Sequence, residues 1–362
     1  PELKEEIPEV DLFIGTGEYQ RLAEALDIQR PAQAAFDGAL KKGRPDYITD
    51  HLAPRYVAPE SFSTYLKIAE GCSQGCAFCI IPKLRGVQRS RSVDDVVAEA
   101  RDLVARGVVE VNLVAQDLTH YGEDIGDPAA LSKLVRRLGE VEGLRWVRLM
   151  YAYPHNFDDE LVAAIAETHN TCKYVDMPLQ HSSDAVLHAM NRRTSRYEME
   201  TLIDKLRTRI DGLTLRTTLL VGHPGETDAD FEDLYGFVAK HRFERMGCFM
   251  YSQEEGTLSA RMPNQLPTAV KRARHGRLMA LQKDIAEAHQ QAMIGRDVEV
   301  LIEGLSEETD LLLQARTEGQ APEIDGIVYI NDAPDDIGRG QFRTARVTES
   351  AGEYDLVAHV IA

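Results

Sequence analysis

Residues 65–79 read Tyr-Leu-Lys-Ile-Ala-Glu-Gly-Cys-Ser-Gln-Gly-Cys-Ala-Phe-Cys. The apolar run at 65–69 is typical of a buried strand, and it leads into a loop that contains two glycines and the cysteines Cys72, Cys76 and Cys79. Three thiolates on one short loop can hold three corners of an iron–sulfur cube, whereas an ordinary four-iron cluster takes four cysteines. The missing fourth thiolate would leave one iron open to a substrate atom. The alternative is structural zinc, which would need a fourth ligand from a distant cysteine or histidine.

Strand-like runs recur along the chain after this loop, separated by segments of helical length. The strand-like runs are 65–69, 109–115, 146–151, 174–179, 213–221 and 246–251, and the helical segments include 93–106, 157–167 and 197–210. Acidic residues follow Ser92, Asn156 and Thr227, as they do in the first turn of a helix. Because strands that alternate with helices pair in parallel through right-handed crossovers, the sequence predicts an α/β fold.

Polar or functional residues cluster directly after five of these strands, at 71–72, 116–117, 153–155, 180–181 and 223–224. Ligand sites in parallel α/β folds lie at the carboxyl ends of the strands. The clustering favours a partial (βα)6 TIM-like barrel, although an open doubly wound sheet also fits the strand count.

The last quarter of the chain has a different pattern. Residues 268–293 read as one long helix, and from 295 short alternating strands separated by Gly and Asp turns predict a small all-β barrel. We therefore expect a fragment of an earlier domain at 1–30, a linker at 31–60, the partial barrel at 61–252, a linker and long helix at 253–294, and the β-barrel at 295–362. The fragment at 1–30 would hold a short strand at 11–15 and a helix at 19–26.

The charge of the chain is unevenly distributed. The formal net charge is −18, and residues 296–362 carry 15 acids and 5 arginines without lysine, which is 5 − 15 = −10. Nucleic-acid affinity depends on Lys and Arg that neutralise phosphates, so generic nucleic-acid binding is disfavoured. The acidic C-terminal module suits a basic partner, and a merely solubilising surface is the alternative.

Composition limits the class of protein further. A hydrophobic content of 43% supports packed cores, and no apolar run approaches the ~18 residues of a membrane span. No leader precedes Pro1. We therefore expect a cytoplasmic protein and, because translation begins with Met, a processed or truncated piece. Three of the five cysteines fall within eight residues, which in a cytosolic chain favours metal binding over disulfides.

The cysteine triplet and several further motifs resemble the radical S-adenosylmethionine (SAM) methylthiotransferases. The matching stretches are 79–86 (CIIPKLRG), 89–92 (RSRS), 114–117 (VAQD), 178–184 (PLQHSSD) and 221–227 (VGHPGET), and the C-terminal barrel stands where this family carries a TRAM domain. Two more stretches, 149–154 (LMYAYP) and 191–196 (NRRTSR), look like the RimO branch, which methylthiolates an aspartate β-carbon of the small-subunit ribosomal protein S-twelve. The resemblance covers essentially the whole chain.

The resemblance implies a mechanism and its cofactors. Cys72, Cys76 and Cys79 would hold a [4Fe-4S] cluster whose open iron chelates SAM, and one electron from the reduced cluster would yield methionine and a 5′-deoxyadenosyl radical. The electron would come from a low-potential donor protein. The family also carries a second [4Fe-4S] cluster on three cysteines of an N-terminal domain, of which this chain would hold only the tail. We therefore expect this chain to cleave SAM without completing sulfur insertion.

The family also suggests which residues contact SAM. Phe78 matches the aromatic residue beside the adenine, Val221 and Gly222 stand where backbone approaches it, and Gln116, Gln180 and Arg192 could bond its polar groups; no catalytic residue is identified. Each of these residues could instead serve packing or a strand end. Arg193, His155, His181 and His223 are weaker candidates, as are Lys83, Arg85, Arg89 and Arg91 beside the cluster. Cys172 and Cys248 read as inert core thiols.

Two other functions remain open at this point. A tRNA methylthiotransferase would need a basic TRAM barrel, and this one is acidic. A non-catalytic, metal-stabilised module that binds the ribosome would contain neither iron nor sulfide and would form no 5′-deoxyadenosine. The acidic barrel favours a small-subunit ribosomal protein as partner over direct action on nucleic acid.

Overall fold

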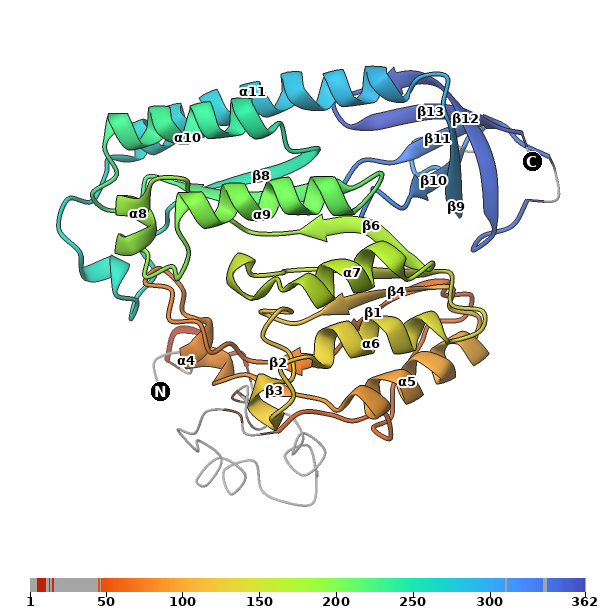
Figure 1. The fold of residues 1–362 in the computed structure, drawn as a ribbon, viewed down its shortest axis with the longest axis horizontal. Helices are drawn as coiled ribbons and strands as arrows, with labels where there is room; N and C mark the ends of the chain where they lie inside the picture. The colour runs from red at the N-terminus through yellow and green to blue at the C-terminus, as the bar shows by residue number, and fades with distance from the viewer. Residues whose placement is uncertain are drawn as a thin grey trace.

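The computed structural model describes residues 5–10, 13, 15, 45, 47–309, 311–334 and 337–361 of the chain. Its larger part is a six-stranded parallel sheet in the order β1-β4-β5-β6-β7-β8 (Figure 1). The strands are β1 (Ser63–Lys67), β4 (Glu110–Val114), β5 (Trp146–Leu149), β6 (Thr171–Asp176), β7 (Thr214–Val221) and β8 (Arg245–Met250). Within the described residues β1 and β8 do not pair, so the sheet is open along one side. The predicted α/β fold with an incomplete barrel is confirmed.

Helices follow the strands and cover one face of the sheet. They are α5 (Val93–Ala105), α6 (Ala130–Gly139), α7 (Asp159–Glu167), α8 (Asp184–Ala189), α9 (Arg196–Arg209) and α10 (Asp228–His241). The sequence sets where several of them begin: the side chains of Ser92, Asp158 and Thr227 each accept a backbone N–H of the first turn. For α7 the cap is thus Asp158 and not Asn156.

The predicted position of the fourth strand is wrong by three residues. We expected 174–179, and the strand observed is Thr171–Asp176. Cys172 therefore lies inside the strand and not before it. The apolar residues that misled the assignment, Met177 and Leu179, are buried, but they belong to the segment that leads away from the strand. The predicted strand at 11–15 and helix at 19–26 lie largely or wholly outside the described residues.

The two faces of the sheet differ in polarity. On the helix side, Val111 and Leu113 of β4 belong to the main hydrophobic core. Side chains alternate along a strand, so Glu110 and Asn112 point to the opposite face. Arg148, Asp176 and Arg216 occupy equivalent positions on the neighbouring strands β5, β6 and β7. The inner face of the incomplete barrel is thus lined with polar groups.

The smaller part is a closed five-stranded barrel in the order β10-β11-β13-β12-β9, joined to the sheet by the long helix α11 (Thr268–Met293). Its strands are β9 (Asp297–Leu305), β10 (Leu313–Thr317), β11 (Val328–Asp332), β12 (Phe342–Ala351) and β13 (Asp355–Val360). Both the helix and the barrel were predicted, and both are confirmed. The remaining described elements are short. They are the two-stranded ribbon of β2 (Ala69–Glu70) and β3 (Arg89–Ser90), the helix α4 (Ile81–Arg85), and the 3-10 turns η2 (Glu123–Ile125), η3 (Pro154–Asn156) and η4 (Ser259–Arg261). Among the described residues, no helix is long and apolar enough to cross a membrane.

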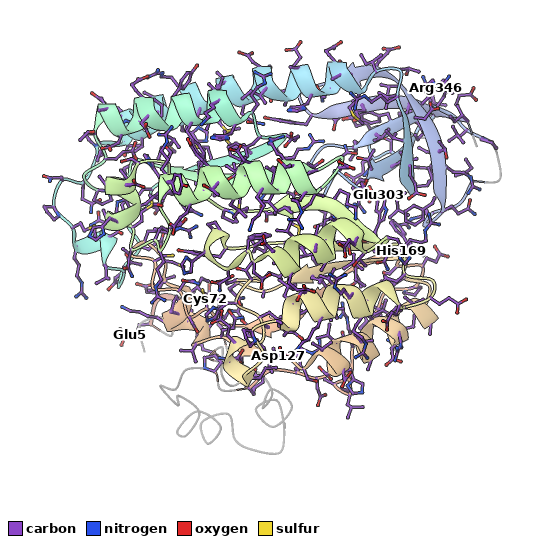
Figure 2. All side chains as sticks on the ribbon, viewed as in Figure 1. Glu5, Cys72, Asp127, His169, Glu303 and Arg346 are labelled. Carbon is purple, nitrogen blue, oxygen red and sulfur yellow. The ribbon has the colours of Figure 1, made fainter. Side chains whose placement is uncertain are left out.

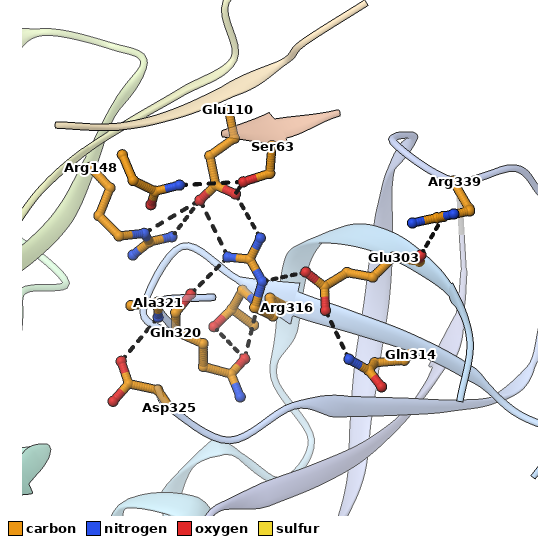
Figure 3. Close-up of polar contacts among 12 residues, drawn as sticks. Ser63, Glu110, Arg148, Glu303, Gln314, Arg316, Gln320, Ala321, Asp325 and Arg339 are labelled. Carbon is orange, nitrogen blue, oxygen red and sulfur yellow. Dashed lines mark hydrogen bonds and ion pairs between the residues drawn. The ribbon is translucent and has the colours of Figure 1, made fainter. Parts of the chain in front are cut away.

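A buried ion network joins the two parts (Figure 3). Glu110, at the start of β4, pairs with Arg148 of β5 at 3.1 Å and with Arg316 of β10 at 2.6 Å. Glu110 and Arg148 are fully buried and Arg316 is 1% exposed. The loop after β10 closes the amino-terminal end of the incomplete barrel, where Ala321 packs in a cluster with Trp146 and other residues.

Candidate active site

The cysteine loop lies at the carboxyl ends of the parallel strands, where Figure 2 labels Cys72. It follows β1 and β2 and is held by its backbone. The N–H of Cys72 donates to Gly86 O at 3.1 Å, and the N–H of Ala77 donates to Met190 O at 2.8 Å. The N–H of Cys79 donates to Cys76 O at 3.1 Å, which closes a tight turn between those two cysteines. The structure thus brings the three predicted ligands together on one anchored loop.

Gly71 permits the chain to enter this loop. Its φ is +84°, and a Cβ added there would lie 2.3 Å from Val87 O. We expect Gly71→Ala to destabilise the fold by clearly more than the ~1–2 kcal/mol that a left-handed conformation costs a non-glycine residue, and to lower the iron content after reconstitution. Gly107→Ala is the matched control, because Gly107 has φ +94° and nothing within 4 Å of an added Cβ. Equal unfolding free energies for the two variants in denaturant titrations would contradict this expectation.

A buried polar chain supports the loop from below. Gln74 Nε2 donates to Asp117 Oδ2 at 2.9 Å, and the Gln74 backbone N–H points at Cys72 Sγ at 3.4 Å. Asp117 is itself fixed by the hydroxyl of Thr119, which donates to its Oδ1 at 2.9 Å. Because Gln74 and Asp117 are almost fully buried, these bonds exchange little with water, and they hold the first cysteine in a defined position.

The three thiols are half-buried, and all are free. Burial raises the pKa of Cys72 to about 12 and also raises the pKa of Cys79. A bound metal centre deprotonates its thiol ligands, so it would supply the positive charge that this environment lacks. In the described part of the chain, no three His, Cys, Asp or Glu side chains converge closely enough to share a single metal ion. A cube places one thiolate at each of three separate corners, and a loop with three half-buried thiols fits that donor set.

The other two cysteines do not supply a fourth thiolate on this loop. Cys172 is fully buried near the start of β6, at the end of the sheet away from the loop, and Cys248 is 7% exposed within β8. Burial raises the pKa of each to about 12.

Arg192 lies against the cysteine loop. Arg192 and Arg193 lie in the connection between α8 and α9 and not on a helix. The guanidinium of Arg192 donates to Cys76 Sγ at 3.8 Å and to Pro178 O at 2.6 Å, and it stacks over the ring of Tyr153 at 4.1 Å. These contacts fix the guanidinium of Arg192 against the cysteine loop. Arg193 is exposed, and its backbone N–H donates to Tyr153 Oη at 3.0 Å.

Phe78, Val221 and Gly222, three of the predicted SAM-contact residues, do not belong to one side-chain cluster in the described structure. Phe78 packs against a cluster that contains Leu220 and Tyr251. Val221 ends β7 next to Leu220 but belongs to the main core, and Gly222 follows with φ +79°, facing the side chain of Lys271. The Gly222 N–H donates to Glu226 at 2.5 Å, so a buried carboxylate fixes this turn.

The two glutamines behave differently from each other. Gln116 Oε1 accepts the Gly71 N–H at 2.7 Å, so its side chain supports the cysteine loop directly. Gln180 is half-buried with φ +72°, and both its backbone groups bond to β7. A non-glycine residue held in the left-handed region is uncommon and often marks a functional position.

The histidines after the strands also separate into two groups. Burial lowers the pKa of His181 and of His223 to about 4, so both are neutral at physiological pH. His181 Nδ1 accepts the Ser183 N–H at 3.0 Å, and His223 Nε2 lies 2.8 Å from Ser259 Oγ. His155 is exposed.

Most of the basic residues beside the cysteine loop, at 83–91, make contacts within the fold. Arg91 is buried and pairs with Asp95 and Glu99, both at 2.5 Å. Arg89 donates to backbone carbonyls of its own loop and to Tyr47 O. Arg85 lies 3.8 Å from Glu70, and Lys83 donates to Gly256 O.

Sequence reasoning missed several residues of the site. Gln74 and Asn191 were not singled out, although Asn191 Nδ2 donates to Gly75 O at 2.6 Å. Tyr153 was noted only as a residue after a strand. Asp117 was noted only as a polar residue after a strand. Arg274 of the long helix α11 donates to Glu226 at 2.7 Å, a contact that nothing in the sequence indicates. Asp117, Asn191 and Tyr153 fall inside the quoted motifs, and Gln74 lies in the quoted cysteine stretch, so their positions carried a signal. Their partners, and the role of Arg274, depend on tertiary contacts.

Comparison with known proteins places this site in a class. The Radical SAM superfamily profile matches residues 66–238, which include the cysteine loop, and the TRAM domain profile matches residues 294–361. The fold and the loop thus define a radical SAM enzyme with a C-terminal TRAM domain. The predicted class of enzyme is confirmed.

Curated relatives narrow the class to one family. A ribosomal protein uS12 methylthiotransferase RimO of Anaeromyxobacter sp. (strain K) is 54% identical over 361 residues, which are 100% of this chain and 75% of that protein. The protein of the same name from Geotalea uraniireducens (strain Rf4) is 47% identical over 99% of this chain and 79% of its own length. The chain belongs to the RimO family of radical SAM methylthiotransferases.

Proposed function

We propose that this chain is the radical SAM and TRAM part of an enzyme that methylthiolates the β-carbon of an aspartate in the small-subunit ribosomal protein uS12, the protein for which its relatives are named. The observation that carries the proposal is the loop of three half-buried thiols at the carboxyl ends of parallel strands. In this proposal Cys72, Cys76 and Cys79 would hold a [4Fe-4S] cluster. When bound and reduced, the cluster would supply the electron for cleavage of SAM and so the radical chemistry that activates the substrate carbon.

The residues around the loop have distinct roles in this proposal. Arg192 contacts the sulfur of Cys76 and would help to orient it, and Gln74 with Asp117 fixes the position of Cys72. The side chain of Phe78 and the backbone at Val221 and Gly222 would contact the adenine of SAM. The buried, neutral surroundings of His181 and His223 would help to exclude water from the reactive centre.

The remaining predicted contacts are Gln180 and Gln116. The strained backbone at Gln180 holds its side chain near the carboxyl edge, where it would bond polar groups of SAM. Gln116 already accepts the Gly71 N–H, so it would act mainly through the cysteine loop. The low-potential electron donor would be a separate protein.

The substrate class is supported by charge. The C-terminal barrel nets −10, whereas tRNA phosphates would require a basic surface. A basic ribosomal protein is electrostatically complementary to such a barrel.

The proposed reaction has a direct test. After anaerobic reconstitution with iron and sulfide, the full-length enzyme containing this chain should add one methylthio group to purified uS12 in the presence of SAM and a low-potential reductant. Mass spectrometry of peptides would place the group on an aspartate, and 5′-deoxyadenosine should form alongside. A group found on tRNA, with uS12 unmodified, would refute the proposed substrate.

A further inference from the structure

A buried ion pair ties the long helix α11 to the turn that follows β7. The guanidinium of Arg274 donates to Glu226 Oε1 at 2.7 Å and to Glu226 O at 3.3 Å. Arg274 is 6% exposed and Glu226 is 4% exposed. Charged side chains are rarely buried to this extent unless they are paired. The pair therefore fixes the turn to a helix that continues to the C-terminal barrel (Figure 1).

The same carboxylate holds the backbone of the turn. Glu226 Oε2 accepts the N–H of Gly222 at 2.5 Å and the N–H of His223 at 3.2 Å. A Cβ added at Gly222 would lie 2.4 Å from Cγ of Lys271, which precedes Arg274 on α11 by about one turn. The helix thus contacts Gly222 directly through Lys271 and indirectly through Arg274 and Glu226.

A second buried bond continues from this turn to the cysteine loop. His223 Nε2 lies 2.8 Å from Ser259 Oγ, and both residues are fully buried. The Ser259 N–H donates to Ala77 O at 2.9 Å, and Ala77 stands between Cys76 and Phe78 in the chain. The turn after β7 and the cysteine loop are therefore joined by a continuous chain of buried contacts that begins at Arg274.

The charge of Arg274 keeps the carboxylate of Glu226 a strong acceptor. Burial raises the pKa of Glu226, and Arg274 is the largest effect that opposes the shift. Hydrogen bonds to an ionised acceptor are about twice as strong as bonds between neutral groups. Without Arg274 the neutral form of Glu226 would be favoured, and the N–H groups of Gly222 and His223 would be held less firmly.

We propose that Arg274 is a positioning residue for SAM. It acts through Glu226 on the turn at Gly222, and the contact of His223 with Ser259 passes the restraint to the cysteine loop. The inference rests on the proposed function, in which this turn and this loop contact the adenine, and it adds the group that orders both. A site that is already ordered loses less conformational freedom on binding, so these contacts should raise the affinity for SAM.

The test compares Arg274→Met with Arg277→Met, the same change about one turn further along α11. Arg277 pairs with Glu232 at 2.5 Å, and both of these side chains are about half exposed. Each variant is made in the full-length enzyme that contains this chain and is reconstituted anaerobically, and SAM binding is measured by equilibrium dialysis. We expect Arg274→Met to bind SAM about tenfold more weakly, as for loss of an outer-shell partner of a metal ligand, and Arg274→Lys to recover part of the loss. Arg277→Met should stay within about twofold of wild type.

Two further measurements separate positioning from a general loss of stability. In protein without cluster or SAM, amide hydrogen exchange in peptides that cover 221–227 should be faster for Arg274→Met and unchanged for Arg277→Met. In the formation of 5′-deoxyadenosine, the KM for SAM should rise for Arg274→Met, while kcat should change by less than about twofold. A protein that is only partly folded would instead lose kcat at an unchanged KM.

A milder variant keeps the inference testable if Arg274→Met does not fold. Ser259→Ala removes the hydroxyl that meets His223 and leaves the backbone bond to Ala77 in place. Its KM for SAM should rise about threefold, as for loss of one hydrogen bond, with the iron content unchanged. A wild-type KM in this variant would contradict the inference.

The outcomes also separate the inference from the proposed function. If folded Arg274→Met binds SAM as tightly as wild type and exchanges equally at 221–227, the positioning role is overturned and the proposed function stands. If the reconstituted wild type binds no SAM, the proposed function fails and this inference fails with it.

Discussion

Cys76→Ser should abolish reductive cleavage of SAM. Only three thiolates stand on the loop, and loss of one would leave two, too few to hold a cluster with a single open iron. Even loss of an outer-shell partner commonly lowers metal affinity about 10–100-fold, so loss of a ligand should exceed that. Iron and sulfide content after anaerobic reconstitution, and 5′-deoxyadenosine formed under strong reductant, measure the effect.

Cys248→Ala provides the matched control. This thiol is buried in β8 and packs with the main core, so its loss should leave iron content and SAM cleavage close to wild type. If the two variants lose iron to the same degree, or if Cys76→Ser still forms 5′-deoxyadenosine at the wild-type rate, the assignment of the loop as the cluster site is refuted.

Arg316→Met should destabilise the fold by about 3–5 kcal/mol, the cost typical of removing one partner of a buried ion pair. Burial acts to raise the pKa of Glu110, but Arg316 and Arg148 outweigh it and hold that pKa at about 2. Without Arg316, Glu110 would keep one cation in a site with no access to water. Arg346→Met is the control, because its pair with Asp297 is about half exposed, and it should cost roughly 0–1 kcal/mol.

The pair of Glu110 with Arg316 also makes the stability of the fold depend on pH. A carboxyl group whose folded pKa is below its unfolded value stabilises the fold above the unfolded pKa and loses that contribution as the pH falls. For Glu110 the window runs from its ordinary value of 4.5 down to about 2. Wild-type stability in denaturant titrations should therefore fall across this window more steeply than that of Arg316→Met. Parallel pH curves for the two proteins would contradict the role of the network.

The fold could be predicted in outline because its signals are local. Apolar runs, caps such as Ser92 and Thr227, and the uninterrupted helix at 268–293 are properties of neighbouring residues. The fourth strand was misplaced because Met177 and Leu179 are as apolar as strand residues, and only pairing with β5 and β7 fixes its limits. The insertion of Arg316 into the sheet could not be predicted, since its partner is 206 positions earlier in the chain.

The candidate site was predictable to the extent that it lies in one loop. Spacing alone identified Cys72, Cys76 and Cys79. Gln74 and Asp117 meet across 43 positions, and Arg192 reaches Cys76 across 116, so no pattern in the sequence pairs them. The basic residues near the loop show the reverse case, in which a residue was suggested for binding but serves the fold. Arg91 was a candidate because it is a cation beside the cysteines, yet it is buried and pairs with two acids of α5.

The long separation of Glu110 and Arg316 has a consequence for biosynthesis. Domains usually fold as units in the order in which they are made, yet here a carboxylate of the first domain finds its second cation only when residue 316 of 362 has been made. Until then the amino-terminal end of the incomplete barrel is not covered by the loop after β10, and the carboxylate of Glu110 lacks its pair with Arg316. The parallel sheet should therefore reach its full stability only after β10 has been made, and chains that terminate before the β-barrel should be substrates for chaperones and proteases.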